Sequence, residues 1–333
     1  MTPRDASPAA RGASRERQKG RAAASTAGGP AGAPAISRLL DQLRPRAKAL
    51  IATIFGDALL PIGGGIWLKD LIRLTRPFGM SERLARTAVF RLKADDWLSA
   101  ERIGRESFYR LTERGLHSFL FAAQRIYALP ETQWDGRWSV AILSPDLASA
   151  ERDRLVKAAG WTGFAAVGRH LLIHPSARQS TALRSIVSDI GLAEQVLLLE
   201  GQDLSALPPA RVGEIVARFW SLDSLAALYR EFVARFHPYL QALSRRAGQI
   251  GGEEAFTLRT LLIHEYRRIL LKDPGLPLAL LPEEWPGREA VLLTRDLYRI
   301  LAAPAQNYVL DSIKLDRLKA RPDTSFYARF GGL

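Results

Sequence analysis

Arginine and threonine side chains gather in one short segment, at positions that a helix would turn toward solvent. A guanidinium carries a planar fork of N–H donors that matches a phosphate or the O6/N7 edge of guanine, and a hydroxyl can bond to either group. The segment is therefore predicted to contact a polyanion, duplex DNA above all. The residues expected to make these contacts are Arg83, Arg86, Thr87 and Arg91.

Each of these arginines has a plainer alternative, which is an ion pair on the protein surface. Glu82 precedes Arg86 by four residues, the separation at which side chains meet on a helix. Arg86 thus has a partner ready within its own helix. The prediction depends on the set and not on any one member.

A second basic group follows in two runs, 98–103 and 107–111, whose residues favour β-strands. A short link containing Gly104 joins the runs, which predicts a hairpin with a basic tip. Such a tip can lie against the phosphate backbone or in the minor groove. Arg105 is expected to make this contact, with Arg102 and Arg110 beside it.

The charge of the chain is concentrated at one end. The 333 residues carry a formal net charge of +13, and residues 1–127 hold 22 basic against 11 acidic side chains. Residues 128–333 hold 25 against 23. A basic end joined to a nearly neutral remainder indicates a polyanion-binding module, with a merely solvated basic surface as the alternative.

Several other kinds of site are excluded by residue type or spacing. The chain has no cysteine, which excludes disulfides, a thiolate nucleophile and Cys-ligated zinc or iron–sulfur centres. It has no Gly-x-x-x-x-Gly-Lys-Ser/Thr phosphate loop and no Gly-x-Ser-x-Gly turn. We therefore expect no catalytic residue, no metal and no cofactor.

The remaining candidates for metal chemistry are weak. His170 and His174 are four residues apart but fall in a predicted strand, where this spacing does not form the ligand pair of a helix. Asp146 and Asp153 fall near a strand end and on a helix, where a nuclease could use them to hold Mg²⁺. Turn and helix-surface roles are far commoner for such carboxylates.

Apolar spacing predicts the elements that must position the basic side chains. The pattern over 44–127 gives a helix, a short strand at 66–68, a second helix, a turn, and then a helix from a cap at Ser81 to about Lys93. The hairpin and a last amphipathic helix follow. This order is that of a winged helix-turn-helix domain, whose recognition helix enters the major groove. The apolar face of the 81–93 helix is expected to hold Leu84, Ala85, Ala88, Val89 and Leu92.

The rest of the chain divides into a mixed part and a helical part, so the expected fold class is α+β. The order β-α-β-β-α-β over 129–205 predicts a ferredoxin-like domain. Helices dominate afterwards, the last of them expected over 287–302. The expected divisions are a disordered basic tail with a short lead-in helix (1–43), the winged-helix domain (44–128), the ferredoxin-like domain (129–205), a helical effector and dimerisation domain (206–310) and a C-terminal extension (311–333).

Short motifs recur in order across roughly residues 44–310. They are Arg44-Pro45-Arg46 with Phe55-Gly56-Asp57, the runs 82–92 and 104–112, Trp134-Asp135-Gly136-Arg137-Trp138, Asp273-Pro274-Gly275-Leu276-Pro277 and Trp285-Pro286-Gly287. Together they resemble the PaaX family, the transcriptional repressors of phenylacetate catabolism. The N-terminal tail lies outside this resemblance.

The resemblance implies a dimeric repressor with a winged-helix DNA-binding domain, a central domain similar to the Cas2 nucleases, and a helical C-terminal domain. It implies binding to double-stranded operator DNA and release by an aryl-acyl-CoA, of which phenylacetyl-CoA is the best known. It also carries DNA recognition onto Arg83, Arg86, Thr87 and Arg91, and the wing contact onto Arg105.

A pocket for a CoA thioester should pair cationic with aromatic side chains, because the ligand is anionic at one end and aromatic at the other. For each candidate, capping a helix or filling a core is the alternative. The candidates by residue type are His264, Tyr266, Arg267, Arg268 and Trp285.

Two further functions stay open, a metal-dependent nuclease that uses the Cas2-like domain and a protein that binds or hydrolyses acyl-CoA. The chain starts without the apolar segment of a secretory signal and has no apolar run of bilayer length. We therefore expect a cytoplasmic protein that does not contact membranes, and the family resemblance implies that it is a homodimer.

Overall fold

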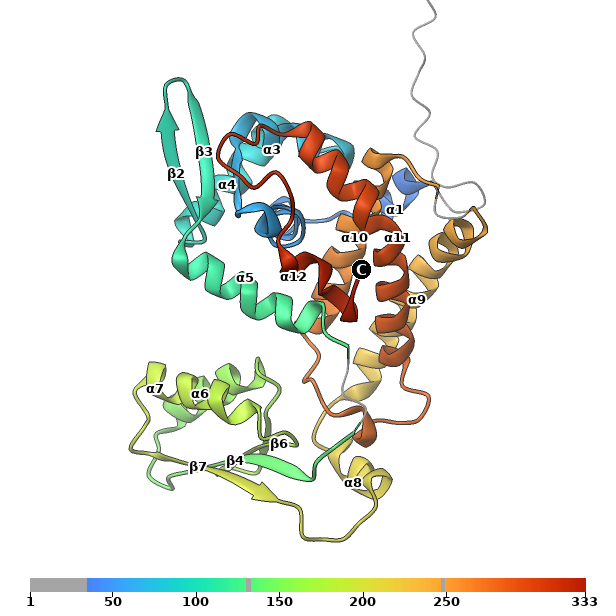
Figure 1. The fold of residues 1–333 in the computed structure, drawn as a ribbon. Helices are drawn as coiled ribbons and strands as arrows, with labels where there is room; N and C mark the ends of the chain where they lie inside the picture. Colours follow the sequence, from blue (N-terminus) through green and yellow to red (C-terminus); the bar gives the residue numbers. More distant parts are fainter. Residues whose placement is uncertain (1–34, 130–132, 247–248) are drawn as a thin grey trace, which may run out of the picture.

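A computed structural model describes residues 35–129, 133–246 and 249–333. The predicted disordered tail, residues 1–35, lies outside the described residues apart from Ala35. Figure 1 shows a large, mostly helical part of the molecule and, below it, a smaller part that combines helices with a sheet. Within the described ranges, no helix combines the length and apolarity that a bilayer crossing needs.

The N-terminal part combines helices with a small antiparallel sheet. Its three strands lie in the order β1-β3-β2, and β2 pairs with β3 from Leu98 opposite Leu111 to Ile103 opposite Glu106. The elements are α1 (Ile36–Leu43), α2 (Ala47–Ile54), β1 (Gly65–Trp67), α3 (Leu68–Thr75), α4 (Glu82–Ala94), β2 (Leu98–Ile103), β3 (Glu106–Leu111) and α5 (Glu113–Ile126). Between α2 and β1 the chain continues as one turn of π-helix, Phe55–Leu59, and a short 3₁₀ helix, Leu60–Ile62.

Helix α4 begins at the predicted cap. The Ser81 hydroxyl accepts a hydrogen bond from the Leu84 amide at 3.3 Å, and Glu82 stands in the first turn, where a carboxylate favours the helix dipole. Ala85, Ala88, Val89 and Leu92 are buried as expected. Leu84 is not, since its side chain is 48% exposed, so its assignment to the apolar face was wrong. Ala85, in the same turn, is fully buried, so position 84 lies at the edge of the buried face.

The central unit is a four-stranded antiparallel sheet with two helices on one face (Figure 1). The strand order β5-β6-β4-β7 places the first and third strands of the unit at its centre, as in ferredoxin-like folds. The predicted order β-α-β-β-α-β is confirmed. The elements are β4 (Arg137–Leu143), α6 (Ser149–Gly160), β5 (Ala165–Val167), β6 (Leu171–His174), α7 (Gln179–Ile190) and β7 (Val196–Gln202).

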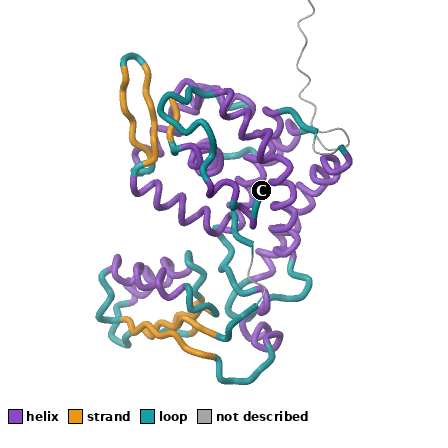
Figure 2. The backbone as a smooth tube through the Cα atoms, in the orientation of Figure 1, coloured by secondary structure: helices purple, strands orange, loops and turns teal. Residues whose placement is uncertain are grey.

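The C-terminal part is helical, as Figure 2 shows by colour. Its helices are α8 (Pro209–Val216), α9 (Leu222–Arg245), α10 (Gly252–Leu270) and α11 (Pro286–Ser312), followed by the short α12 (Thr324–Tyr327). The predicted end of the last long helix at 302 was wrong, because α11 runs ten residues further with Pro304 inside it. Three residues after Pro304 are buried, namely Ala305, Gln306 and Val309. The free energy gained by burying them outweighs the helical hydrogen bond that proline, without an N–H, cannot make.

The hydrophobic core does not follow the predicted domain divisions. The N-terminal part and the C-terminal helices share one continuous core, whereas the central unit has a core of its own. Helix α10 lies in the middle of the shared core, with buried side chains on nearly every face. Phe326 and Phe330 of the C-terminal extension are also buried in it. The N-terminal part is therefore packed together with the helices behind it, with no separate core of its own.

Candidate nucleic-acid interface

One face of α4 is open to solvent and carries the predicted contact residues. The side chains of Arg83, Arg86, Thr87 and Arg91 are exposed, while the opposite face packs into the shared core. The helix lies at the outer end of the molecule beside the β2–β3 hairpin (Figure 1). The structure thus brings the four residues together on an accessible surface.

Local contacts on this face hold two of the four side chains. Arg86 donates to Glu82 Oε1 through Nε at 2.9 Å and Nη2 at 2.6 Å, the predicted ion pair. Thr87 Oγ1 donates to the Arg83 carbonyl at 2.9 Å. Both partners of the ion pair are more than half exposed, so the pair contributes little and a phosphate can compete for the guanidinium. Across the described ranges, no carboxylate pairs with Arg83 or Arg91.

An aromatic residue on this face was missed by the sequence prediction. Phe90 is 70% exposed and stands one turn after Arg86 and Thr87. An exposed phenyl ring costs solvation free energy unless a partner covers it, and thymine methyl groups and sugars are apolar partners at a DNA surface. The signal in the sequence is an aromatic residue placed among the polar positions of an amphipathic helix.

The β2–β3 hairpin projects from the molecule as a narrow arm (Figure 1). Its two-residue loop begins with Gly104, whose φ of 58° lies in the left-handed region that glycine adopts without strain. Arg102, Arg105 and Arg110 are all exposed along the arm. Arg105 stands at the tip, beside the glycine, as predicted.

The residues after α11, 313–333 and here named the strap, run back to this hairpin; they make up most of the C-terminal extension predicted over 311–333. Lys314 Nζ lies 2.8 Å from Glu106, and Arg317 Nη1 lies 2.5 Å from Glu101. Asp316 accepts a hydrogen bond from Trp67 Nε1 at 2.9 Å, next to the same sheet. The hydrogen bond from Arg317 lowers the pKa of Glu101. The strap thereby pairs two hairpin carboxylates and leaves the hairpin arginines as its free charges.

A buried carboxylate connects this surface to the helices behind it. Asp57, in the turn of π-helix after α2, is 1% exposed, and its Oδ1 accepts from Tyr127 at 2.7 Å and Tyr298 at 2.8 Å. Arg259 Nε lies 2.9 Å from Oδ2, and Arg329 Nη1 lies 3.2 Å from Oδ1. Burial raises the pKa of both tyrosines, which keeps them neutral donors. The cluster joins α2, α5, α10, α11 and the strap at one point.

The five predicted effector residues contact different partners. His264 is buried, bonded to Thr53 Oγ1 through Nδ1 at 3.1 Å, and burial lowers its pKa to about 3. Tyr266 packs against Phe232, and Trp285 against Tyr229.

Arg267 and Arg268, the two arginines among these five residues, bind different partners. Arg268 pairs with Glu265 at 2.8 Å. Arg267 donates to the Ala49 carbonyl at 3.1 Å, across the interface between α10 and α2. The structure does not gather the five side chains around one cavity, and their role stays a prediction.

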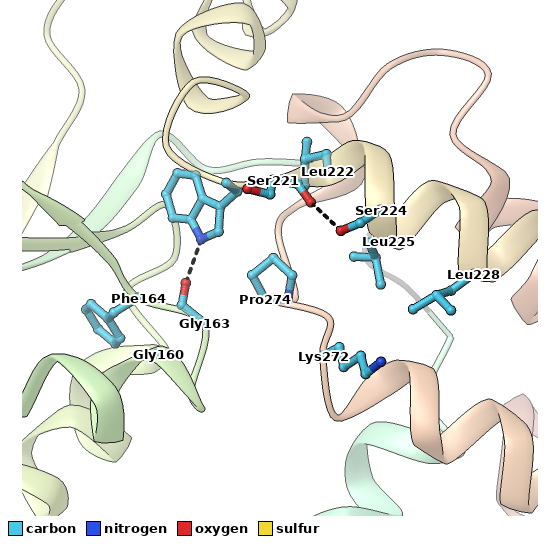
Figure 3. Close-up of a pocket in the computed structure, with 11 residues that line it drawn as sticks. Gly160, Gly163, Phe164, Ser221, Leu222, Ser224, Leu225, Leu228, Lys272 and Pro274 are labelled. Carbon is cyan, nitrogen blue, oxygen red and sulfur yellow. Dashed lines mark hydrogen bonds between the residues drawn. The ribbon is translucent and has the colours of Figure 1, made fainter. Parts of the chain in front are cut away.

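Two larger pockets lie where the central unit meets the rest. One, of about 480 Å³, lies between the 160–164 turn and α9, where Trp220 Nε1 donates to the Gly163 carbonyl at 2.8 Å (Figure 3). Gly163 has a φ of 91°, and a Cβ there would stand 2.1 Å from the Pro274 carbonyl oxygen, so only glycine fits. The other, of about 530 Å³, lies between α2, α5, α10 and Trp161.

The residues considered for metal chemistry have other contacts. His174 is buried and its Nε2 bonds to the Pro274 carbonyl at 3.0 Å, with its pKa lowered to about 4 by burial. Asp153 pairs with Arg152 at 3.0 Å, and Asp146 is exposed in a loop. In the parts of the chain that the structure describes, no three His, Asp or Glu side chains cluster as metal ligands would.

Comparison with known proteins identifies the family. Three family models match in succession: a PaaX-like protein at 46–115, a PaaX protein central Cas2-like domain at 131–212 and a PaaX-like protein C-terminal domain at 220–311. The chain is 36% identical over 287 residues to the transcriptional repressor PaaX of Escherichia coli (strain K12), covering 86% of this chain and 90% of the relative. This chain belongs to the PaaX family of transcriptional repressors. The predicted family resemblance is confirmed.

A solved structure was also matched, an uncharacterized protein, Rv0674, from Mycobacterium tuberculosis. It shares 21% identity, covers 72% of this chain and 90% of its own, and has a TM-score of 0.44. The structural comparison adds nothing to the family assignment, which stands on the sequence matches.

Two of the motifs that carry the resemblance to the PaaX family have structural roles. The Phe55-Gly56-Asp57 motif supplies the buried carboxylate, and Asp273-Pro274-Gly275 forms a joint between the parts of the molecule. Asp273 accepts from Tyr229 of α9 and from the Gly275 amide, and its carbonyl accepts from Arg125 of α5. These two motifs therefore hold parts of this PaaX-family repressor together, while the basic face of α4, which belongs to the 82–92 motif, is open to solvent.

Proposed function

We propose that this PaaX-family repressor binds double-stranded operator DNA through a winged helix-turn-helix domain made by α2, α3, α4 and the β2–β3 hairpin. In this proposal α4 enters the major groove and the hairpin is the wing. The observation that carries the proposal is the exposed basic face of α4, with its opposite face fixed in the core. A rigid helix with free guanidinium groups meets the geometric needs of groove recognition.

The contacts are divided between bases and backbone. Arg83 and Arg86, near the helix N-terminus, are assigned to base edges or phosphates, and Thr87 and Arg91 to the groove walls. Arg105 contacts the backbone or the minor groove from the wing tip. Phe90 adds an apolar contact to a sugar or a thymine methyl group, because its ring is open to solvent on the same face.

The active unit in this proposal is a homodimer. A two-fold dimer presents two α4 helices to two half-sites one helical turn of DNA apart, or a multiple of it. We keep the divisions 44–128, 129–205 and 206–310 as functional parts, with the last as the effector and dimerisation part. A repressor acts where its operator is, so we place the protein in the cytoplasm.

The regulated genes are those of an aromatic catabolic pathway of the phenylacetate type, and the effector is an aryl-acyl-CoA such as phenylacetyl-CoA. Release requires that the effector bind more tightly to a conformation that cannot span both half-sites than to one that can. The repressor relative indicates a regulatory protein and not an enzyme.

The test is a selection from a random duplex library, followed by titration of the selected DNA with and without phenylacetyl-CoA. The expected result is a site with two related half-sites one turn or a multiple apart, from which phenylacetyl-CoA releases the protein. Recovery of no preferred sequence would contradict the proposal. A preferred sequence that no CoA thioester affects would contradict the effector alone.

A further inference from the structure

The pocket of about 530 Å³ lies where the three parts of the molecule meet. Its walls are the N-terminal end of α2, one face of α5, the end of α10, and Trp161, which ends α6 of the central unit. Leu92 of α4 and Trp97, which follows that helix, close the side nearest the proposed DNA contact. No other pocket described above reaches all three parts.

Two aromatic rings in this pocket have no aromatic partner among the described residues. Phe121 and Trp161 are each 67% exposed, although both are large apolar side chains that proteins normally bury. They belong to different parts of the molecule, α5 and the central unit, and line the same cavity with Trp97. A planar apolar group placed between them would cover the two exposed rings and the open side of Trp97, which is half-buried against Phe119.

Every charged side chain that lines the pocket is a cation. The four are Arg46, Lys48, Arg125 and Arg267, and no carboxylate is among the lining residues. Lys48 pairs with Asp95, and Arg125 bonds to the Asp273 carbonyl, so these two are held in place from outside the cavity. Arg46 is exposed at the rim, and no described carboxylate pairs with it.

Arg267 is a half-buried cation of the set. It makes one hydrogen bond, to the Ala49 carbonyl, and its Nε is buried without an acceptor among the described residues. A buried N–H group without an acceptor is costly, and an anion is the partner that relieves this cost best. Burial lowers the pKa of Arg267, which agrees with a charge that lacks full compensation.

We propose that this junction pocket binds an amphipathic anion, with an aromatic or other planar apolar group between Trp97, Phe121 and Trp161 and phosphate or carboxylate groups on the cations. The proposal rests on the proposed function for the identity of the ligand, since an aryl-acyl-CoA has this chemistry. It names a site that differs from the predicted effector residues, of which only Arg267 lines the cavity.

The position of the pocket gives the ligand a way to act on DNA binding. Lys48 of α2 is bridged to Asp95, the residue that ends α4, and Leu92 of α4 reaches the cavity wall. A ligand that fills the space between α2, α5 and the central unit changes how these elements sit against one another. Because α4 is bonded to one wall, its direction relative to the second α4 of a dimer changes with it.

The test measures ligand binding by the full chain with two probes, the fluorescent aromatic anion anilinonaphthalene sulfonate and phenylacetyl-CoA. The pocket variants are Trp161→Ala and Arg46→Ser, both at exposed positions where folding tolerates change. The matched controls are Leu204→Ala, at an exposed apolar residue elsewhere, and Arg211→Ala on α8. Thermal unfolding of each variant checks that it folds.

The expected result is saturable binding of both probes by the unchanged chain, with Kd raised about tenfold or more in each pocket variant and unchanged in the controls. Equal binding of both probes by pocket variants and controls, or no binding by the unchanged chain, would overturn the site.

The outcomes separate the site from the proposed function. Sulfonate binding that is lost in the pocket variants but not displaced by phenylacetyl-CoA would uphold an anion site and overturn its assignment to the acyl-CoA, and the proposed effector would then stand or fall on DNA release alone. Release of DNA by phenylacetyl-CoA with the same midpoint in all variants would uphold the effector and overturn the site.

Discussion

Asp57 is the residue on which the packing of the N-terminal part against the C-terminal helices depends most. Its carboxylate lies between two guanidinium groups, those of Arg259 and Arg329, at the centre of a core that excludes water. Neither arginine is exposed by more than 5%. The single carboxylate offsets one of the two positive charges and is the carboxylate that both arginines share, so a substitution at Asp57 leaves two buried cations with neutral acceptors alone.

We expect Asp57→Asn to lower the free energy of unfolding by about 3–5 kcal/mol, the usual cost of breaking a buried ion pair from one side. Urea unfolding followed by tryptophan fluorescence measures this change. Asp189→Asn, at an exposed position on α7, is the matched control and should change stability by less than about 0.5 kcal/mol. Equal stability of the two variants would show that the cluster does not hold the core together.

Residue-scale prediction from sequence worked where the partner is close in the chain. The Ser81 cap and the pair of Glu82 with Arg86 were predicted because helical spacing fixes both. The partners of Asp57 come from residues about 70 to 270 positions away, and no local pattern carries that information. Leu84 and Phe90 were misjudged or missed because exposure in a helix depends on which neighbours cover it.

At the scale of elements, the strap and the hairpin form one assembly. The strap buries Phe326 and Phe330 in the shared core and extends two cations to the hairpin carboxylates. The buried rings fix the strap, and the exposed ion pairs connect it to the arm that we assign to DNA. Exposed pairs of this kind contribute about 0.2–1 kcal/mol each, enough to steady an arm but not to hold a fold.

We expect Lys314→Ala/Arg317→Ala to leave the fold intact and to speed hydrogen exchange of the β2 and β3 amides, because the arm loses its two outer contacts. Hydrogen exchange with mass spectrometry reads this directly. The control is Lys319→Ala/Arg321→Ala, in the same strap, where Lys319 pairs with Asp323 and not with the hairpin. Unchanged exchange in the first variant would mean that the strap does not support the wing.

Strands and helices were largely predictable because their patterns are local. Runs of alternating or spaced apolar residues gave the hairpin, the central sheet and the long helices near their observed positions. The end of α11 was not predictable, since Pro304 normally stops a helix and only packing on α10 explains why it does not. The strap has little regular structure, so periodicity gave no sign of it.

At the scale of the whole molecule, the joint around Asp273-Pro274-Gly275 attaches the central unit to a body with a separate core. His174 bonds to the Pro274 carbonyl and Trp220 to the Gly163 carbonyl, both across this joint. These hydrogen bonds, with apolar packing of Ala165, Trp138 and Ile173 against the shared core, hold the central unit in place. The order of the three parts was predicted from the sequence, whereas their packing was not, because tertiary contacts between distant segments leave no periodic trace.

At this scale, the proposed role of the molecule is to recognise operator DNA with the exposed basic face of α4. The most direct test is a fluorescence anisotropy titration of selected operator duplex, at fixed moderate salt, with Arg83→Ala/Arg86→Ala and with Arg211→Ala/Arg218→Ala, two exposed arginines at α8. At about 1–3 kcal/mol for each lost base or phosphate contact, the α4 variant should bind about thirtyfold more weakly or worse, and the α8 variant like the unchanged chain. An α4 variant that folds and binds operator with unchanged affinity would contradict the account.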